Sequence, residues 1–140
     1  MTDLERFVKA REDVHPRALA ELRAGAKRSH WMWFVFPQIA GLGSSAMART
    51  YAIRDAAEAR AYLAHPLLGA RLREATAAIA AARGSAEAIL GGVDAMKLRS
   101  SMTLFAAVAD DPTPFDAALA RFFGGERDAA TLDLLGDRRG

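Results

Sequence analysis

The sequence predicts an all-α protein, and three observations support that fold class. Apolar residues recur at helical spacing over most of the chain, and capping residues and glycines mark where successive helices begin and end. No segment alternates apolar and polar residues as a half-buried strand does, and no hairpin dipeptide joins two apolar runs. A length of 140 residues is typical of one domain. We therefore expect residues 1–140 to form a single compact all-α domain of seven to nine helices.

In the first half of the chain, helix starts are marked by capping residues or by a proline that suits the first turn. In order, these starts are Thr2 with Glu5, His15-Pro16, Ser44 or Ser45, and Asp55 with Glu58. Gly25 ends the second of these helices, and Pro66 stops the fourth because the residue before a proline disfavours helical backbone angles.

The second half shows the same kind of signals. The predicted starts are Leu68, Ser85, Asp94, Thr113-Pro114 and Asp128. Glycines follow three of these segments, at Gly84, residues 91–92 and residues 124–125. The helix from Leu68 is the clearest, since its apolar residues fall on one face while Arg71 and Glu74 fall on the other.

Composition excludes several classes of protein. Hydrophobic residues make up 51% and charged residues 26% of the chain, which is typical of a globular protein rather than a disordered one. The net charge is only +2, and the basic residues are mixed with acidic ones, so we expect no nucleic-acid partner. The longest apolar stretch is far shorter than the roughly 20 residues that cross a bilayer. With no signal peptide at its start and no cysteine, the chain is expected to be cytoplasmic.

The most unusual segment is residues 29–45, which contains both tryptophans and two of the seven phenylalanines within six residues. Each such ring buries roughly 150–250 Å², so the segment forms either the centre of the core or the wall of a pocket. Periodicity cannot decide between a buried strand and a buried helix for residues 30–36. Ser29 as an N-cap and Pro37 as a stop favour a short helix.

The same residues carry a family resemblance. The chain resembles a family of small bacterial proteins known as domain of unknown function 1810, which is all-α. The matching segments are residues 4–8, 18–22, 27, 29–38, 41–43, 51–53, 61–66, 68–72, 94 and 97–105. The resemblance implies a helical fold and no particular activity. The family is sometimes labelled calpastatin, but a calpastatin-type inhibitor is a disordered chain, and this sequence has the aromatic residues and helix caps of a packed domain.

A second, looser resemblance concerns residues 97–135, which are similar to the corresponding part of bacterial N-glycosidases that act on ADP-ribose linkages. This resemblance implies hydrolysis of a nucleotide or ADP-ribose-type bond.

Lys97 is the best candidate for a chemical role on the helix from Asp94. Lys97 and Ser101 fall within the apolar arc of that helix, one turn apart, instead of on its polar face. A lysine there either covers apolar surface with its stem or presents its ammonium to an anion. Arg99, near the other edge of the arc, is a second candidate anion contact or a solvated charge.

The aromatic segment and the loop after it supply the other candidates. His30 suits acid–base chemistry through its ordinary pKa, and Gln38 is a polar side chain beside an aromatic wall. One of the rings can stack on a ligand. The loop before the next helix offers backbone N–H groups to an anion, or simply forms a tight turn. The candidate ligand-binding residues here are Trp31, Trp33, Phe36, Gly41, Gly43, Ser44 and Ser45.

Other chemistries have less support. The three histidines lack metal-ligand spacing and there is no cysteine, so neither a metal site nor a cofactor is expected. The carboxylates of Glu21, Glu58, Glu74 and Glu87 are interpreted as helix-surface or capping groups rather than an acid–base pair.

Two functions from different classes remain open. In the first, the aromatic segment, Gln38, the loop and Lys97 surround one pocket that binds a small anionic, nucleotide-like ligand. In this hypothesis Lys97 positions the anion and His30 or Gln38 handles a proton or water. In the second, the protein is a non-catalytic protein–protein interaction module whose aromatic residues simply build the core.

Overall fold

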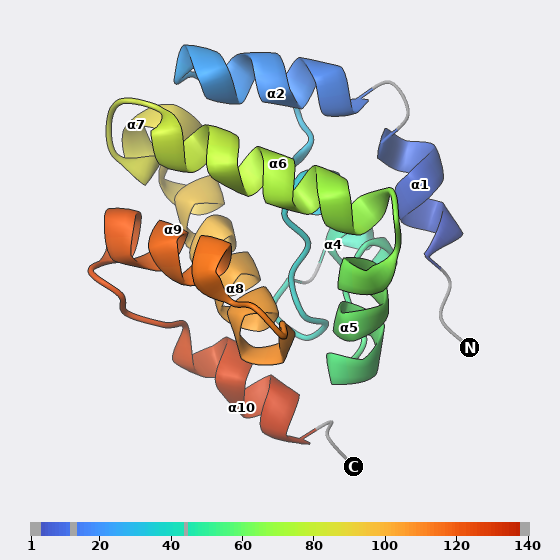
Figure 1. Ribbon diagram of the computed structural model, residues 1–140. Coiled ribbons are helices and arrows are strands. Elements are labelled where there is room, and N and C mark those ends of the chain that lie inside the picture. Colours follow the sequence, from blue (N-terminus) through green and yellow to red (C-terminus); the bar gives the residue numbers. More distant parts are fainter. Residues whose placement is uncertain (1–3, 12–13, 44, 138–140) are drawn as a thin grey trace.

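The longest helix, α8 (Gly92–Val108), is the centre of the molecule. The structure, a computed structural model, describes residues 4–11, 14–43 and 45–137. Ten of the 17 residues of α8 are buried, as expected of a helix that neighbours cover on most sides. Four helices pack against it: α5 (Ala56–Ala64), α7 (Ala86–Leu90), α9 (Thr113–Phe123) and α10 (Ala129–Asp137). Figure 1 shows α8 behind α9, with α10 below both.

A layer of three helices covers one side of this core. In it α6 (Leu68–Ala81) lies between α2 (Val14–Ala24) and α9 and contacts both (Figure 1). The predicted apolar stripe of α6 is buried, from Leu68 through Leu72 to Ile79. Thr76 lies within the stripe and donates its hydroxyl to the Leu72 carbonyl, so its polar atom is satisfied inside the core.

The tight corner between α5 and α6 requires a glycine at position 69. A Cβ atom at Gly69 would lie 2.1 Å from the carbonyl oxygen of Leu63, well inside the contact distance of any real atom pair. Glycine alone lets the last turn of α5 approach α6 this closely. The expected end of α5 before Pro66 is confirmed, with His65 as its C-cap.

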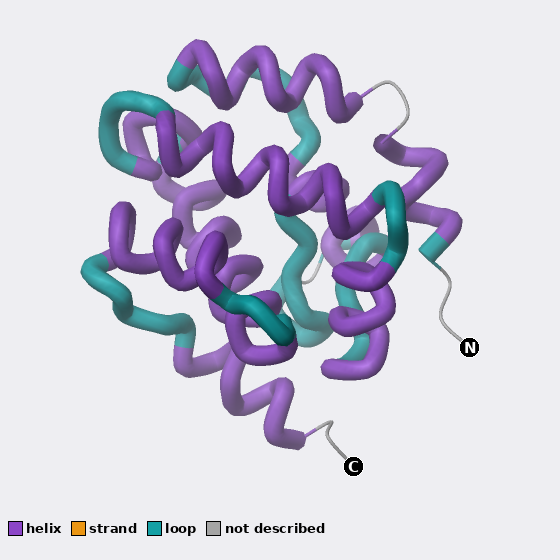
Figure 2. The backbone as a smooth tube through the Cα atoms, in the orientation of Figure 1, coloured by secondary structure: helices purple, strands orange, loops and turns teal. Residues whose placement is uncertain are grey.

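The aromatic segment contains the short helix α3 (Met32–Val35), which α1 (Glu5–Arg11) and α6 contact. The preference for a helix over a strand is therefore confirmed, but the predicted N-cap is wrong. Trp31 occupies the N-cap position without a side-chain bond, and the Ser29 hydroxyl donates to Glu21 instead. The one β-type pairing in the described residues is a parallel bridge between Ile39 and Ile53. Figure 2 accordingly draws no strand in the described residues.

The predicted helix starts are largely confirmed. Ser45, Asp55 and Ser85 are N-caps whose side chains accept an N–H of the following turn, and Asp128 accepts the N–H of Thr131 in the same manner. The cap at Thr2 lies outside the described residues. The structure has ten helices in its described part, so the expected seven to nine is too low. The nine starts named in the sequence correspond to nine of these helices, including the single turns α4 (Ala46–Thr50) and α7, and the tenth is α3, a single turn of four residues without a side-chain cap.

One buried cluster of apolar side chains runs from Phe7 to Leu135 and joins all these layers. Within the part of the chain that the structure describes, no helix has both the length and the apolar character to cross a bilayer.

Candidate functional site

A single carboxylate holds the beginning of the aromatic segment against α2. Glu21 Oε1 accepts hydrogen bonds from the backbone N–H of Arg28 at 2.6 Å, the N–H of Ser29 at 2.9 Å and the indole N–H of Trp31 at 3.0 Å. The Ser29 hydroxyl donates to Oε2. Burial is the largest single influence on the pKa of Glu21 and raises it, but the four bonds together outweigh burial and lower the pKa to about 2. Glu21 is therefore ionised at neutral pH and fixes the Trp31 ring.

Beside this anchor, two lysines share one aspartate. Lys27 Nζ lies 2.9 Å from Asp94 Oδ2, and Lys97 Nζ lies 3.4 Å from Asp94 Oδ1. The three side chains are 11%, 25% and 18% exposed for Lys27, Lys97 and Asp94 respectively, so none is fully solvated. We call these three residues the lysine cluster. It carries one net positive charge at a partly buried position.

Each lysine also lies over an aromatic ring. Lys27 Nζ is 5.4 Å from the centroid of the Trp31 ring, and Lys97 Nζ is 4.9 Å from that of Trp33. Both distances are within the range of a cation–π interaction. The structure thus brings the aromatic segment and the helix of Lys97 together in space. Lys97 lies over an aromatic face and pairs with the chain's own Asp94, and its contact with a ligand stays a prediction.

A second contact between the same elements runs through Gln38. Its Nε2 donates to the Ser100 hydroxyl at 3.0 Å, and that hydroxyl donates to the Met96 carbonyl at 2.9 Å. Gln38 follows directly after the buried Pro37 and precedes the Ile39–Ile53 bridge, so its backbone is fixed on both sides. The side-chain amide is therefore held against the first half of α8, next to the turn that carries Lys97.

The remaining predicted residues of the aromatic segment divide into core and surface. Trp31 and Phe36 are each 1% exposed, so their rings belong to the core. Trp33 is half-buried and keeps an accessible edge beside Lys97, while His30 is exposed. Within the described residues the His30 side chain makes no hydrogen bond or ion pair, so nothing in the chain orients it for proton transfer.

The glycines and Ser45 of the loop before α4, where we expected an anion to bind, each have a structural role. Gly41 has φ +107°, a backbone conformation that favours glycine, and a Cβ at Gly43 would lie 2.6 Å from that of Ala48. The Ser45 hydroxyl accepts the Ala48 N–H as the cap of α4. Ser44 lies outside the described residues. Gly41, Gly43 and Ser45 thus form a turn and a cap, and their contact with a ligand stays a prediction.

Arg99 and Ser101, two further predicted site residues, are not part of the lysine cluster. Arg99 follows Lys97 by two residues, so it lies on another side of α8. Its guanidinium donates to the carbonyls of Glu126 and Arg127 at 3.0 and 2.8 Å and thereby holds the loop between α9 and α10. Ser101 is fully buried, and its hydroxyl has no hydrogen-bond partner in the described structure.

Sequence reasoning missed the acidic partners. Glu21 is the anchor of Trp31 rather than a surface group. Glu58 does accept the backbone N–H of Arg54 just before α5, as a capping residue does, but it is 0% exposed and also pairs with Arg6, so its interpretation as a surface residue is wrong. For Asp94 a signal was present, because it precedes Lys97 by three residues and such pairs are neighbours on a helix.

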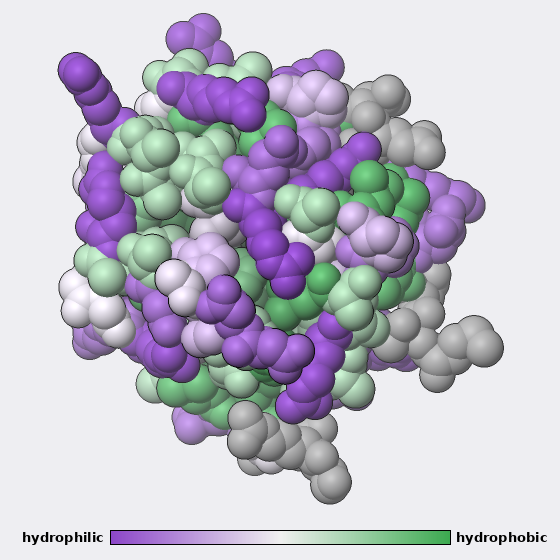
Figure 3. All heavy atoms as spheres, viewed as in Figure 1, coloured by the Kyte–Doolittle hydropathy of each residue, from purple (hydrophilic) through white to green (hydrophobic). Residues whose placement is uncertain are grey.

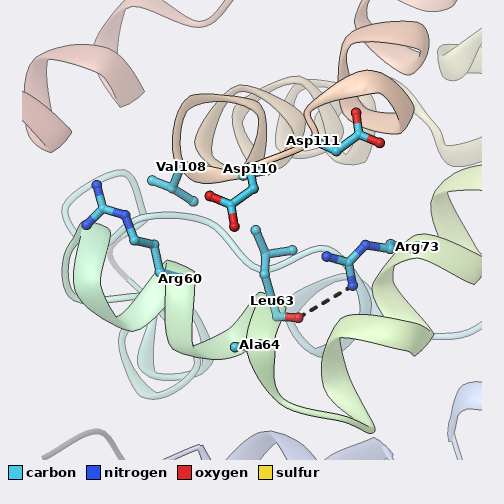
Figure 4. A pocket seen from close by; sticks show the side chains of 8 residues that line it. Arg60, Leu63, Ala64, Arg73, Val108, Asp110 and Asp111 are labelled. Carbon is cyan, nitrogen blue, oxygen red and sulfur yellow. Dashed lines mark hydrogen bonds between the residues drawn. The ribbon is translucent and has the colours of Figure 1, made fainter.

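One hollow lies elsewhere, between α5, α6 and the link from α8 to α9. It has a volume of about 370 Å³. Figure 4 shows Asp110 pointing into it, with Arg60 and Arg73 on opposite sides. Because these charges have opposite signs, they can neutralise one another. Over the face seen in Figure 3, hydrophilic and hydrophobic residues are interspersed rather than gathered into one large area.

The fold and the site define an all-helical protein in which an aromatic segment meets the central helix at a pair of lysines. A family model described as protein of unknown function (DUF1810) matches residues 1–135, and the chain belongs to this family. It is also similar to the crystal structure of the conserved hypothetical protein Rv1873 from Mycobacterium tuberculosis. The two chains are 52% identical, the match covers 96% of each, and the TM-score is 0.93. A search among curated proteins found no match.

Proposed function

We propose that this protein binds a small anionic, nucleotide-like ligand at the lysine cluster. The observation that carries the proposal is the pair of half-buried ammonium groups, which share one carboxylate and lie on tryptophan faces. Asp94 neutralises one of the two charges, so the other is available to a phosphate or carboxylate. The longer of the two ion pairs is that of Lys97, which makes Lys97 the group that the ligand recruits.

The flat part of the ligand is assigned to Trp33. This ring is half-buried while Trp31 is in the core, so only Trp33 has a face or edge that a base or sugar can contact. Gln38 adds a polar contact nearby, because its amide nitrogen is bound to Ser100 and its amide oxygen accepts no hydrogen bond within the described residues. Charge, ring and amide together favour a ligand with a phosphate and a heterocycle.

A thermal-shift series tests this proposal. NAD, ADP-ribose, AMP and ribose 5-phosphate are each added at millimolar concentration, and a ligand present at 100 times its Kd stabilises the protein by about 2.7 kcal/mol. We expect at least one of the four to raise the Tm by several degrees. Lys97→Met removes the recruited charge and abolishes the shift, whereas Lys9→Met, at an exposed lysine of α1, leaves it unchanged. No shift with any ligand, or an equal loss in both variants, contradicts the proposal.

We extend the proposal to hydrolysis of a nucleotide or ADP-ribose-type bond, with His30 or Gln38 acting on a proton or water. Support comes from the position of Gln38 against α8 and from the resemblance of residues 97–135 to N-glycosidases. The test is product analysis after incubation with the ligand that gives the largest shift. Turnover that falls in Gln38→Ala or His30→Ala while the thermal shift is retained supports catalysis, and the absence of any product contradicts it.

One observation favours the alternative function of a protein-binding module. Val93 and Met96, neighbours on the first turns of α8, are each 71% exposed and lie beside the lysine cluster. The partner that fits this surface carries an apolar side chain flanked by carboxylates. In this case Lys97→Met has a neutral or stabilising effect on folding and no small ligand shifts the Tm. Val93→Ser with Met96→Ser removes binding of an acidic amphipathic peptide, measured by fluorescence anisotropy.

A further inference from the structure

The hollow between α5, α6 and the link from α8 to α9 combines both signs of charge with an apolar floor (Figure 4). We call it the charged hollow, after the Arg60, Arg73 and Asp110 side chains that line it. Its volume of about 370 Å³ is at the lower end of the roughly 300–1,000 Å³ that small-molecule sites have. None of the described residues that line it belongs to the lysine cluster.

The floor of the charged hollow is part of the core. Leu63 near the end of α5 and Val108 at the end of α8 both line it, and they are 9% and 8% exposed. Both belong to the buried apolar cluster, so close packing holds them in place. In Figure 4 the Leu63 side chain lies between the two arginines. A short aliphatic chain that spans the hollow would therefore rest on apolar atoms.

The two arginines lie on opposite sides of this floor (Figure 4). Arg73 on α6 is positioned by the chain, since its Nη1 donates to the Leu63 carbonyl at 3.4 Å. Arg60 on α5 is exposed, and its side chain makes no hydrogen bond or ion pair within the described residues. A guanidinium offers paired N–H donors that match the two oxygens of a carboxylate. Each side of the hollow is thus suited to one carboxylate.

Asp110 adds a negative charge between the arginines. Its carboxylate points into the hollow (Figure 4), and within the described residues it makes no hydrogen bond or ion pair. The neighbouring Asp111 has another role, because its Oδ1 accepts the N–H of Thr113 at 3.1 Å and the Thr113 hydroxyl at 2.6 Å. These bonds, with a smaller contribution from the Arg73 charge, lower the pKa of Asp111. Asp111 therefore fixes the link at the beginning of α9, and Asp110 is the carboxylate directed inwards.

The charges across the hollow follow the order positive, negative, positive. A complementary ligand has a carboxylate at each end, an ammonium between them and a short aliphatic chain. We propose that the charged hollow binds a free acidic amino acid of the size of glutamate. Arg60 and Arg73 each hold one carboxylate, Asp110 accepts from the ammonium, and the methylene groups rest on Leu63. The order of the charges, rather than their sum, selects this ligand, and the site is separate from the lysine cluster.

Isothermal titration calorimetry tests the proposal with L-glutamate and two analogues at constant ionic strength. Glutarate keeps both carboxylates but lacks the ammonium, and γ-aminobutyrate keeps the ammonium but lacks one carboxylate. We expect saturable binding of glutamate at millimolar concentration or below. Each analogue binds at least about tenfold more weakly, the size expected for the loss of one charge-assisted hydrogen bond.

Two variants assign the charges to their residues. Arg60→Gln weakens glutamate binding at least about tenfold, and Asp110→Asn removes the preference for glutamate over glutarate. Both residues are exposed, so we expect both variants to keep the Tm of the natural protein. Arg17→Gln, at an exposed arginine of α2, is the matched control and leaves glutamate binding unchanged.

Three outcomes overturn the assignment. The first is the absence of saturable glutamate binding, or binding by Arg60→Gln that equals that of the natural protein. The second is equal affinity of the natural protein for glutamate and glutarate, which leaves Asp110 without a role. The third is loss of glutamate binding in Lys97→Met, which places the amino acid at the lysine cluster. Since Lys97→Met is expected to bind glutamate normally, failure here is distinguishable from failure of the proposed function.

Discussion

Two carboxylates in this protein each bind two basic side chains, but they do so under different conditions. Glu58 is 0% exposed, and its partners are Arg6 and Arg54. Asp94 is 18% exposed, and its partners are Lys27 and Lys97. The arginine Arg6 is bound further by two backbone carbonyls, whereas the lysines rest on tryptophan rings. The comparison indicates that the buried carboxylate serves mainly stability, while the lysine partners of the partly exposed one are those that we propose to bind a ligand.

The largest expected effect is at the buried carboxylate. Glu58→Gln removes the negative charge but keeps the size of the side chain, so the Arg6 guanidinium remains partly buried without its counter-charge. Breaking a buried ion pair from one side costs about 3–5 kcal/mol, and the high exposure of Arg54 reduces this to about 2–4 kcal/mol. Urea denaturation measures the free energy of unfolding. Glu87→Gln, at an exposed position of α7, is the control, and equal stabilities of the two variants contradict the comparison.

The next effect concerns Glu21, which holds Trp31 under Lys27. Four hydrogen bonds outweigh burial and lower the folded-state pKa of Glu21 to about 2, from an ordinary value of 4.5. Because the folded pKa is the lower one, the stabilisation is fully present above the unfolded pKa and is lost as the pH falls from about 4.5 towards 2. We expect Glu21→Gln to lose roughly 1–3 kcal/mol at pH 7. The stability difference between variant and natural protein should vanish near pH 2, and a difference that does not change with pH is the contrary result.

A smaller effect is expected at the shared aspartate of the lysine cluster. Asp94→Asn leaves Lys27 and Lys97 without their shared counter-charge and costs about 1 kcal/mol, since the pairs are partly exposed. The loss is greater at low salt than at 1 M salt, where exposed charges are screened. Unfolding measured at both salt concentrations checks this, with Asp133→Asn on α10 as an exposed control. A loss that salt does not alter would mean that packing, not charge, is the cause.

The smallest effect has the opposite sign. Arg49→Ala removes a positive charge that lines the same hollow as Arg6 and Arg54, and the Arg49 side chain makes no hydrogen bond or ion pair within the described residues. We expect a gain of a few tenths of a kcal/mol at low ionic strength, and no change in 1 M salt. Differential scanning calorimetry in phosphate-free buffer detects it. A clear destabilisation would show that Arg49, like Arg6, stabilises the fold.

The sequence predicted correctly the features that depend on residues close together in the chain, such as the helix N-caps. Ser45, Asp55, Ser85 and Asp128 each bind an N–H three residues ahead, so a short window contains the whole interaction. The all-α class and the buried stripe of α6 follow from the same short-range pattern. The predicted number of helices was too low because a single turn such as α3 has no side-chain cap and depends mainly on packing.

The candidate site was predictable only in part, because its pairings span long stretches of chain. Trp33 and Lys97 were both identified as candidates, but their contact bridges 64 positions and no helical pattern encodes it. Lys27 meets Asp94 across a similar separation, and Arg6 meets Glu58 across 52 positions. Carboxylates are mostly surface groups, so nothing in the sequence indicated that Glu58 is buried or that Glu21 binds Trp31.

The positions of the lysines allow ligand binding to be followed in the unmodified protein. The chain has three lysines, of which Lys27 and Lys97 belong to the lysine cluster and Lys9 is exposed on α1. An amine-selective acylating reagent therefore modifies Lys9 at the rate of an unhindered amine, and the ratio of the other two rates to this internal reference measures how well they are shielded. Mass spectrometry of the peptides can follow those ratios as compounds are added, so a screen for occupants needs neither a label nor a substitution.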